Sequence, residues 1–174
     1  MLYVLILGLI VFLGVHSTRI VAGPWRDARV AANPGRWKGL YSLASLIGFA
    51  LIIWGWIGFR AEAPTIYDPP SWGRHLAMLF VWLAFVALAA AYAPVGYIKS
   101  TLKHPMLTAV ILWALAHLLA NGDLASLLLF GSFLAYAIVD RIAVIPRGDP
   151  APRPVTPMGD VVALTVGTVA YAAV

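Results

Sequence analysis

The feature that most constrains this chain is a series of long apolar runs separated by short polar segments. The runs lie at about 2–21, 40–59, 74–93, 105–120, 124–140 and 160–174. A helix needs roughly 20 apolar residues to cross a bilayer, and the first five runs are near that length, whereas the sixth stops short of it. The pattern predicts an all-α, polytopic transmembrane helix bundle with five full spans and a sixth C-terminal span that is either incomplete or trimmed.

Composition supports a single membrane domain. Hydrophobic residues make up 62% of the chain and charged residues 11%, whereas a soluble domain has roughly 45–50% and 25%. The apolar runs take up most of the 174 residues, so we expect one transmembrane domain over 1–174 in contact with the lipid bilayer. The chain has no Cys, which excludes disulfides, iron–sulfur clusters, zinc–thiolate sites and cysteine nucleophiles.

The basic residues predict the orientation in the membrane. The segments 19–38, 94–104 and 141–159 hold ten of the twelve Lys and Arg residues, and Arg60 and Arg74 are the other two. Such an excess is typical of the cytoplasmic side, so we expect a periplasmic N-terminus and cytoplasmic loops at 22–39, 94–104 and 141–159. The last of these loops includes a Pro-rich linker at 146–157. No basic segment precedes the first run, which is therefore interpreted as a retained span rather than a signal peptide. Because the basic residues lie at the ends of runs, they do not indicate a nucleic-acid partner.

Small residues on the second and third runs predict close helix packing. They are Gly48, Gly55, Ala84, Ala87 and Ala91. Helices in lipid approach each other most closely at such positions. Between the fourth and fifth runs, Asn121-Gly122-Asp123 predicts a tight turn in which Asp123 caps the next helix. We therefore expect the fourth and fifth spans to be antiparallel neighbours.

The segment 103–123, KHPMLTAVILWALAHLLANGD, contains the most informative polar residue. Pro105 is suited to the first helical position, and Asn121-Gly122 is suited to the end of a helix. No charged residue lies between Lys103 and Asp123, so His117 is expected inside the bilayer. Ionisable residues at that depth are rare and mark function.

The four histidines are expected at different depths. His117 and His75 lie near the periplasmic ends of their runs, whereas His16 and His104 lie near cytoplasmic ends. Two imidazoles from different helices hold a b-type haem inside a bundle with apolar walls. The alternative is that each histidine only bonds to a neighbouring helix. By depth, His75 is the partner expected for His117.

Two neighbours of His117 extend the candidate site. Trp113 lies four residues earlier on the same helix face, so its ring is expected to pack near the imidazole. Asn121 lies one turn further on and is expected to orient the imidazole, as a group behind a ligand does. The candidate cofactor-binding residues are His117, His16, His75, Trp113 and Asn121. His117 and His16 are the candidate metal ligands, and no catalytic residue is assigned.

Three motifs carry a resemblance to a known family. They are Gly14-Val15-His16-Ser17, Lys103-His104-Pro105, and Trp113-Ala114-Leu115-Ala116-His117 followed by Asn121-Gly122-Asp123. With these motifs the chain resembles NnrU-domain membrane proteins and, through them, is similar to the zeta-carotene isomerases of carotenoid synthesis. Matched by motif, the histidine of the His-Ser pair is His16 and that of the Ala-His pair is His117. On the expected depths, these two histidines differ by roughly 10 Å along the membrane normal.

The resemblance implies an integral protein of the bacterial inner membrane. NnrU-type proteins are associated with nitrite and nitric oxide respiration in denitrifying bacteria. The isomerase relatives hold a b-type haem through histidines and isomerise a cis double bond in a polyene. The resemblance therefore implies a haem b-binding accessory protein of denitrification, with nitric oxide reductase or another respiratory protein as its partner.

Three other functions remain open from the sequence. A haem-dependent cis-trans isomerase of a lipid-soluble polyene is the enzymatic alternative. A membrane methyltransferase is suggested by the His-Pro pair at 104–105, but the chain after 141 lacks the acidic, Gly-containing region that such an enzyme needs. A structural bundle without a cofactor is the simplest alternative.

Overall fold

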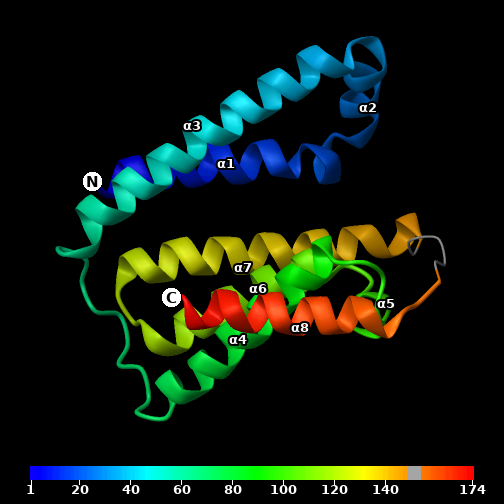
Figure 1. Cartoon of the computed structure of the whole chain (residues 1–174). Helices are drawn as coiled ribbons and strands as arrows, with labels where there is room; N and C mark the ends of the chain where they lie inside the picture. Colours follow the sequence, from blue (N-terminus) through cyan, green and yellow to red (C-terminus); the bar gives the residue numbers. More distant parts are fainter. Residues whose placement is uncertain (149–153) are drawn as a thin grey trace. The chain divides into compact units, whose positions relative to one another are not determined.

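The computed structural model describes residues 1–148 and 154–174, and in these residues the chain is almost entirely helical. The one β-bridge found there joins Thr65 and Asp123. The helices are α1 (Leu2–Val21), α2 (Gly23–Ala32), α3 (Pro34–Arg60), α4 (Gly73–Tyr92), α5 (Tyr97–Leu102), α6 (Pro105–Ala120), α7 (Leu124–Val144), the 3-10 turn η1 (Ile145–Arg147) and α8 (Pro157–Ala172) (Figure 1). The all-α prediction is confirmed for this part of the chain. The Pro-rich linker predicted at 146–157 lies partly outside the described residues.

Four of the described helices are long and apolar enough to cross a membrane: α1, α3, α4 and α7. Helices α6 and α8 are apolar but have 16 residues each. At 1.5 Å per residue they extend roughly 24 Å, less than the ~30 Å of a hydrocarbon core. Both begin at a proline, and α6 ends at Asn121. By the length and composition of its four long helices, the chain is a multi-pass membrane protein. Because α6 and α8 are short, the count of five full spans stays a prediction.

The chain forms two compact units. The first contains Met1–Tyr67 and Asp123–Ser132, and the second contains Asp68–Gly122 and Phe133–Val174. Helix α7 begins in the first unit and ends in the second.

Two segments predicted as loops contain helices. The predicted loop 22–39 holds α2 and the first turns of α3, and the predicted loop 94–104 holds α5. Helix α3 begins early because Asn33 caps it: the backbone N–H of Arg36 donates to Asn33 Oδ1 at 2.9 Å. Pro34 then occupies the first helical position, where its missing N–H costs nothing. Local capping, rather than hydrophobicity, thus sets the start of α3.

In the first unit, α1 and α3 pack in antiparallel fashion through glycines. A Cβ atom at Gly8 would lie 2.6 Å from the backbone N of Ile52, and one at Gly48 would lie 2.7 Å from the backbone N of Phe12. Gly55 approaches α1 equally closely. Real Cβ atoms essentially never lie within 3.0 Å of a heavy atom from another part of the chain. The packing predicted from Gly48 and Gly55 is therefore confirmed, because only glycine allows this separation.

In the second unit, α4 packs against both α6 and α8. The predicted packing residues Ala84 and Ala87 are buried on α4. A Cβ atom at Gly167 of α8 would lie 2.6 Å from the Cα of Val86. At the other end of α4, a Cβ atom at Gly73 would lie 2.5 Å from the carbonyl oxygen of Leu119. Small residues thus bring the three backbones together.

A carboxylate on α8 fixes the short helix α5. Asp160 accepts hydrogen bonds from the backbone N–H groups of Tyr97 at 2.9 Å and Ile98 at 2.8 Å. These are the first two N–H groups of α5, which have no partner within the helix. Gly96 and Gly159 allow the approach, since a Cβ atom on either would clash with the other segment. This charge-assisted cap joins the start of α8 to the segment after α4.

The predicted cap of α7 is present. Asp123 Oδ1 accepts from the backbone N–H of Ser126 at 2.8 Å, and its Oδ2 accepts from the Ser126 hydroxyl at 2.7 Å. Burial raises the pKa of nearby Tyr67, and the negative charge of Asp123 raises it further. The backbone N–H of Leu124 donates to the carbonyl of Pro64 at 2.9 Å, which ties the segment before Tyr67 to the start of α7.

We expect Gly48→Ala to destabilise the protein by about 1–3 kcal/mol, because the new methyl group must push α1 away from α3. Unfolding of the purified protein in detergent, followed by circular dichroism, would measure the loss. Gly14→Ala is the matched control, since a Cβ atom there meets nothing within 4 Å and alanine favours the helix. Equal losses in the two variants would show that the close approach at Gly48 contributes nothing particular.

Candidate functional site

The end of α6 is fixed by Asn121. Both the backbone N–H and the side-chain Nδ2 of Asn121 donate to the carbonyl oxygen of His117, each at 2.9 Å. The His117 carbonyl thus has a main-chain partner, and the side-chain amide adds a second hydrogen bond to it in the last turn of the helix, where main-chain partners run out. Asn121 was expected to orient the imidazole, whereas its side chain donates to the main chain. Its effect is to hold the backbone at His117 in one position.

His117 is half-buried and lies in an aromatic cluster of the second unit. The rings of Trp113 and His117 are 5.4 Å apart with an interplanar angle of 80°, an edge-to-face contact. Phe133 of α7 makes a similar contact with Trp113 at 5.6 Å and 82°. The ring contact expected from the four-residue spacing is present. Phe133 is an additional neighbour that no spacing within α6 could have predicted.

An apolar groove of about 280 Å³ runs between α4 and α6 and ends at Trp113. Its walls are Val81, Ala84, Phe85 and Leu88 of α4, and Ala109, Val110 and Trp113 of α6. The indole of Trp113 therefore contacts His117 and also lines the groove. The imidazole lies one helical turn beyond the groove's end, so an apolar group in the groove would lie near it.

A second pocket of about 490 Å³ lies in the same unit. Its walls come from α4, α5, α6 and α8 and include Thr101 and Thr108. Trp82, another wall residue, donates from Nε1 to the hydroxyl of Thr168 on α8 at 3.0 Å. This pocket could not be predicted from the sequence, because its wall residues come from four separate helices.

His16 lies on α1 in the first unit and packs between aromatic rings. Phe12 stacks on the imidazole at 4.3 Å, and the ring of Tyr41 lies 5.3 Å away. The Nδ1 atom of His16 lies 2.7 Å from the carbonyl oxygen of Phe12. A carbonyl can only accept, so Nδ1 carries the hydrogen and Nε2 carries the lone pair. This is the tautomer in which a histidine ligates metal through Nε2.

The other two histidines lie at helix starts. His75 is exposed in the first turn of α4, two residues after Gly73. Because Gly73 contacts Leu119 across the antiparallel pair α4 and α6, His75 and His117 lie at a similar level. Two residues turn a helix by about 200°, so His75 faces away from the side on which Gly73 meets α6. His104 precedes α6, and its carbonyl accepts from the backbone N–H groups of Leu107 and Thr108.

The candidate ligands are thus divided between the two units. His117, Trp113, Asn121 and His75 belong to the second unit, and His16 belongs to the first. Among the described residues, no group of three or more His, Asp or Glu side chains lies close enough to hold a metal ion. A haem needs only one or two side-chain ligands. The pairing of His117 with His16 or His75 stays a prediction.

These features define a class: a multi-pass, all-helical membrane protein with a histidine and a tryptophan beside an apolar groove. The chain belongs to the NnrU protein family, whose model matches residues 4–174. The match covers both units and nearly the whole chain, so the family resemblance is confirmed. No curated protein and no solved structure matches the chain, and a similarity to zeta-carotene isomerases is therefore not shown.

Proposed function

We propose that this protein binds haem b in the bacterial inner membrane and acts as an accessory protein of nitrite and nitric oxide respiration. In this proposal, His117 would hold the haem iron. The observation that carries it is the half-buried imidazole in contact with Trp113, one turn from a largely apolar groove. Imidazoles and apolar walls are what a helical bundle offers to a b-type haem.

The residues around His117 fit such a group. Asn121 fixes the backbone of His117, and Trp113 limits the rotation of the imidazole. Such supporting contacts hold a ligand ready to bind. The groove of about 280 Å³ is slightly smaller than the roughly 300–1,000 Å³ of a complete small-molecule site. It is therefore suited to the apolar edge of a porphyrin rather than to the whole ring.

His16 is the second ligand that we favour. Its Nδ1 donates to the Phe12 carbonyl, and a histidine oriented in this way coordinates a metal through Nε2. His75 has the expected depth but is exposed and faces away from the helix that carries His117. Chemistry and motif thus favour His16, whereas depth favours His75.

The respiratory role rests on membership of the NnrU family. When bound, haem would supply an iron at which nitric oxide can coordinate by displacing one of the two histidines. His117 and the groove would hold the cofactor in the membrane, where nitric oxide is also soluble. The proposal includes a periplasmic N-terminus, from the distribution of basic residues, and nitric oxide reductase or another respiratory protein as the partner.

A polyene isomerase is the second candidate, and the two pockets favour it. The groove beside Trp113 has only apolar wall residues, and the larger pocket between α4, α5, α6 and α8 is also mostly apolar. An extended hydrocarbon would fit such walls better than a polar substrate. Haem binding through His117 is common to both candidates, so it is the first property to test.

We expect the purified protein to show a Soret band, and His117→Ala to reduce bound haem at least tenfold because an axial ligand is lost. Absorption spectra and a pyridine haemochrome assay give the haem per chain. His104→Ala is the control, since it changes a histidine on the same helix without touching the Trp113 contact. An unchanged haem content in His117→Ala would contradict the assignment, and a wild-type protein without haem would favour a cofactor-free bundle.

The second ligand has its own spectral signature. We expect His16→Ala to retain haem but to convert it from a low-spin, six-coordinate form to a high-spin form, because one of two imidazoles is removed. Electron paramagnetic resonance and the position of the Soret band report this change. If His75→Ala produces the conversion and His16→Ala does not, depth rather than motif identifies the partner of His117.

The two candidate roles differ in the molecule that reaches the haem, which is nitric oxide in one and a polyene in the other. For the respiratory role, we expect added nitric oxide to shift the Soret band, and loss of the gene to raise nitric oxide during growth on nitrite. For the isomerase, an added cis polyene would be converted to its trans form, which chromatography detects. Conversion of a polyene together with unaltered nitric oxide levels would overturn the respiratory role.

A further inference from the structure

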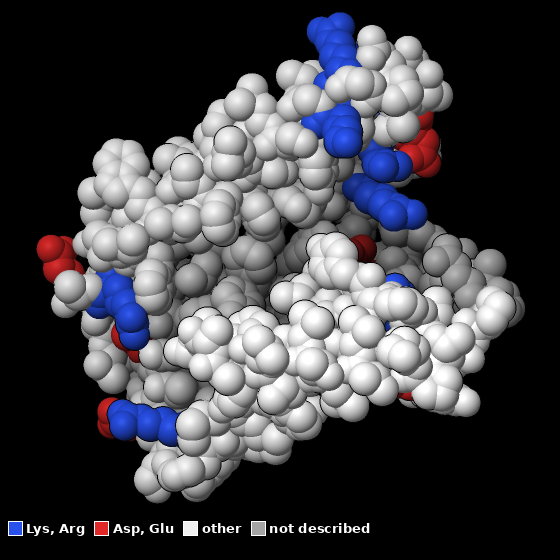
Figure 2. Space-filling model, viewed as in Figure 1, with Lys and Arg blue, Asp and Glu red and all other residues white. Residues whose placement is uncertain are grey.

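A small pocket in the first unit combines basic and aromatic side chains. It has a volume of about 250 Å³ and lies where α2 meets the start of α3. Arg29 and Trp25 line it from α2, and Arg36 and Trp37 line it from α3. The haem proposal uses none of these residues. In Figure 2, basic side chains gather at this end of the unit, over α2 and the first turn of α3.

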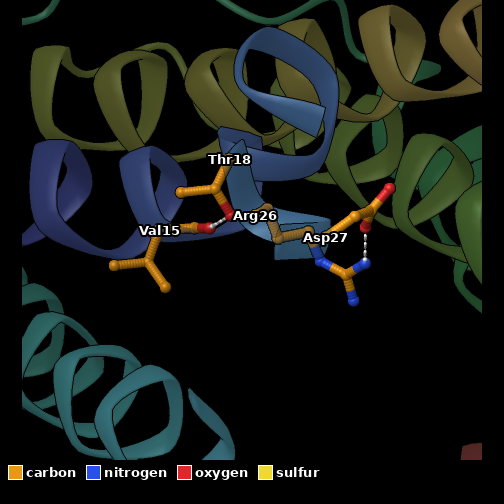
Figure 3. A network of polar contacts seen from close by, with 4 residues as sticks. All are labelled: Val15, Thr18, Arg26 and Asp27. Carbon is orange, nitrogen blue, oxygen red and sulfur yellow. Dashed lines mark hydrogen bonds and ion pairs between the residues drawn. The ribbon is translucent and has the colours of Figure 1, made fainter. Parts of the chain in front are cut away.

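The two arginines of this pocket have no carboxylate partner among the described residues, whereas their neighbour Arg26 has one. Arg26 pairs with Asp27 at 2.6 Å (Figure 3). Asp27, the partner in this ion pair, is not one of the residues that line the pocket. The side chain of Asn33, also in the wall, accepts from the backbone N–H of Arg36 and so leaves the Arg36 guanidinium uninvolved. The pocket consequently holds two positive charges and no negative one.

The two indoles shape the pocket. The rings of Trp25 and Trp37 meet edge to face at 5.7 Å, and the Arg29 guanidinium lies 5.5 Å from the centre of the Trp25 ring. Such contacts restrict the side chains and hold the guanidinium in place. Helix α2 has no buried residue, and tryptophans are typical of the interface between the hydrocarbon core and the headgroups. The pocket therefore lies where lipid headgroups lie.

We propose that this pocket binds the phosphate group of an anionic phospholipid headgroup. Arginine binds phosphate through two parallel hydrogen bonds, and two guanidiniums without carboxylate partners match the negative charge of a phosphodiester. The volume of about 250 Å³ suits a headgroup rather than a larger ligand. Segment 19–38 is also the most basic of the chain, with five Lys and Arg residues, as expected for a segment at an anionic leaflet.

Lipid binding by the purified protein tests this proposal. Native mass spectrometry in detergent would measure the affinity for phosphatidylglycerol and, in a parallel titration, for phosphatidylcholine. Each arginine near an anionic surface is worth about fivefold in affinity, so the double variant Arg29→Gln/Arg36→Gln is expected to bind phosphatidylglycerol roughly 25-fold more weakly. The wild-type protein is expected to prefer phosphatidylglycerol over phosphatidylcholine, and the double variant to lose that preference.

Arg60→Gln is the matched control. Arg60 lies at the other end of α3 and also covers an indole, with its guanidinium 4.7 Å from the ring of Trp56, but it does not line this pocket. Its substitution is expected to change the affinity less than twofold. If Arg29→Gln/Arg36→Gln misfolds, Arg29→Lys/Arg36→Lys keeps the charge and is expected to show a smaller but measurable loss, because the paired hydrogen bonds are absent.

Three results would overturn the proposal. The first is an equal affinity for phosphatidylglycerol in the wild type and in the folded double variant. The second is an equal loss in Arg60→Gln, which would indicate a general charge effect. The third is displacement of the lipid by inorganic phosphate at the same concentration, which would identify a site for a free anion instead of a lipid.

Discussion

Direct contact between helix backbones, made possible by small residues, is the interaction on which the rest of this structure depends. Lipid tails are as apolar as the side chains, so no hydrophobic effect drives helices together in a membrane. Helices associate there through close packing and hydrogen bonds. Gly8, Gly48 and Gly55 provide that contact in the first unit, and Gly167 and Ala84 provide it in the second. The buried residues are accordingly dominated by alanine, whereas large side chains such as Ile57 remain 65% exposed. We expect lipid, rather than protein, to surround those side chains.

Helix ends then decide where polar groups lie. Pro105 and Asn121 limit α6 to 16 residues, which brings His117 into its last turn, and the Asn121 amide satisfies the carbonyl of that residue. An interrupted helix at membrane depth is tolerated only when its polar backbone groups are satisfied. Asn33 does the same at the start of α3 and so fixes the first turn that carries Arg36. Each polar site is therefore built on a capped helix end.

The sequence was sufficient for features that depend on neighbours along the chain. The apolar runs located the long helices, the spacing of four residues predicted the ring contact between Trp113 and His117, and Asp123 was recognised as a cap. It was not sufficient where the neighbour comes from another helix. Phe133 beside Trp113, Asp160 on the start of α5, and the pocket at Arg29 each need a tertiary contact. Helix α2 was missed because its charged residues hid a short amphipathic helix.

Arginine and histidine side chains differ in the free energy that their burial costs. This difference favours a different kind of ligand for each of them. A guanidinium is always charged, so it is stable only near water or an anion, which is why Arg29 and Arg36 suit a phosphate at the membrane surface. An imidazole has a neutral form with a lone pair, so it can lie deeper and bind iron there. His117, on a helix with no charged residue between Pro105 and Ala120, has the surroundings that such a ligand needs. The chemistry of each side chain is therefore consistent with the two proposals, a haem at the histidines and a lipid phosphate at the arginines.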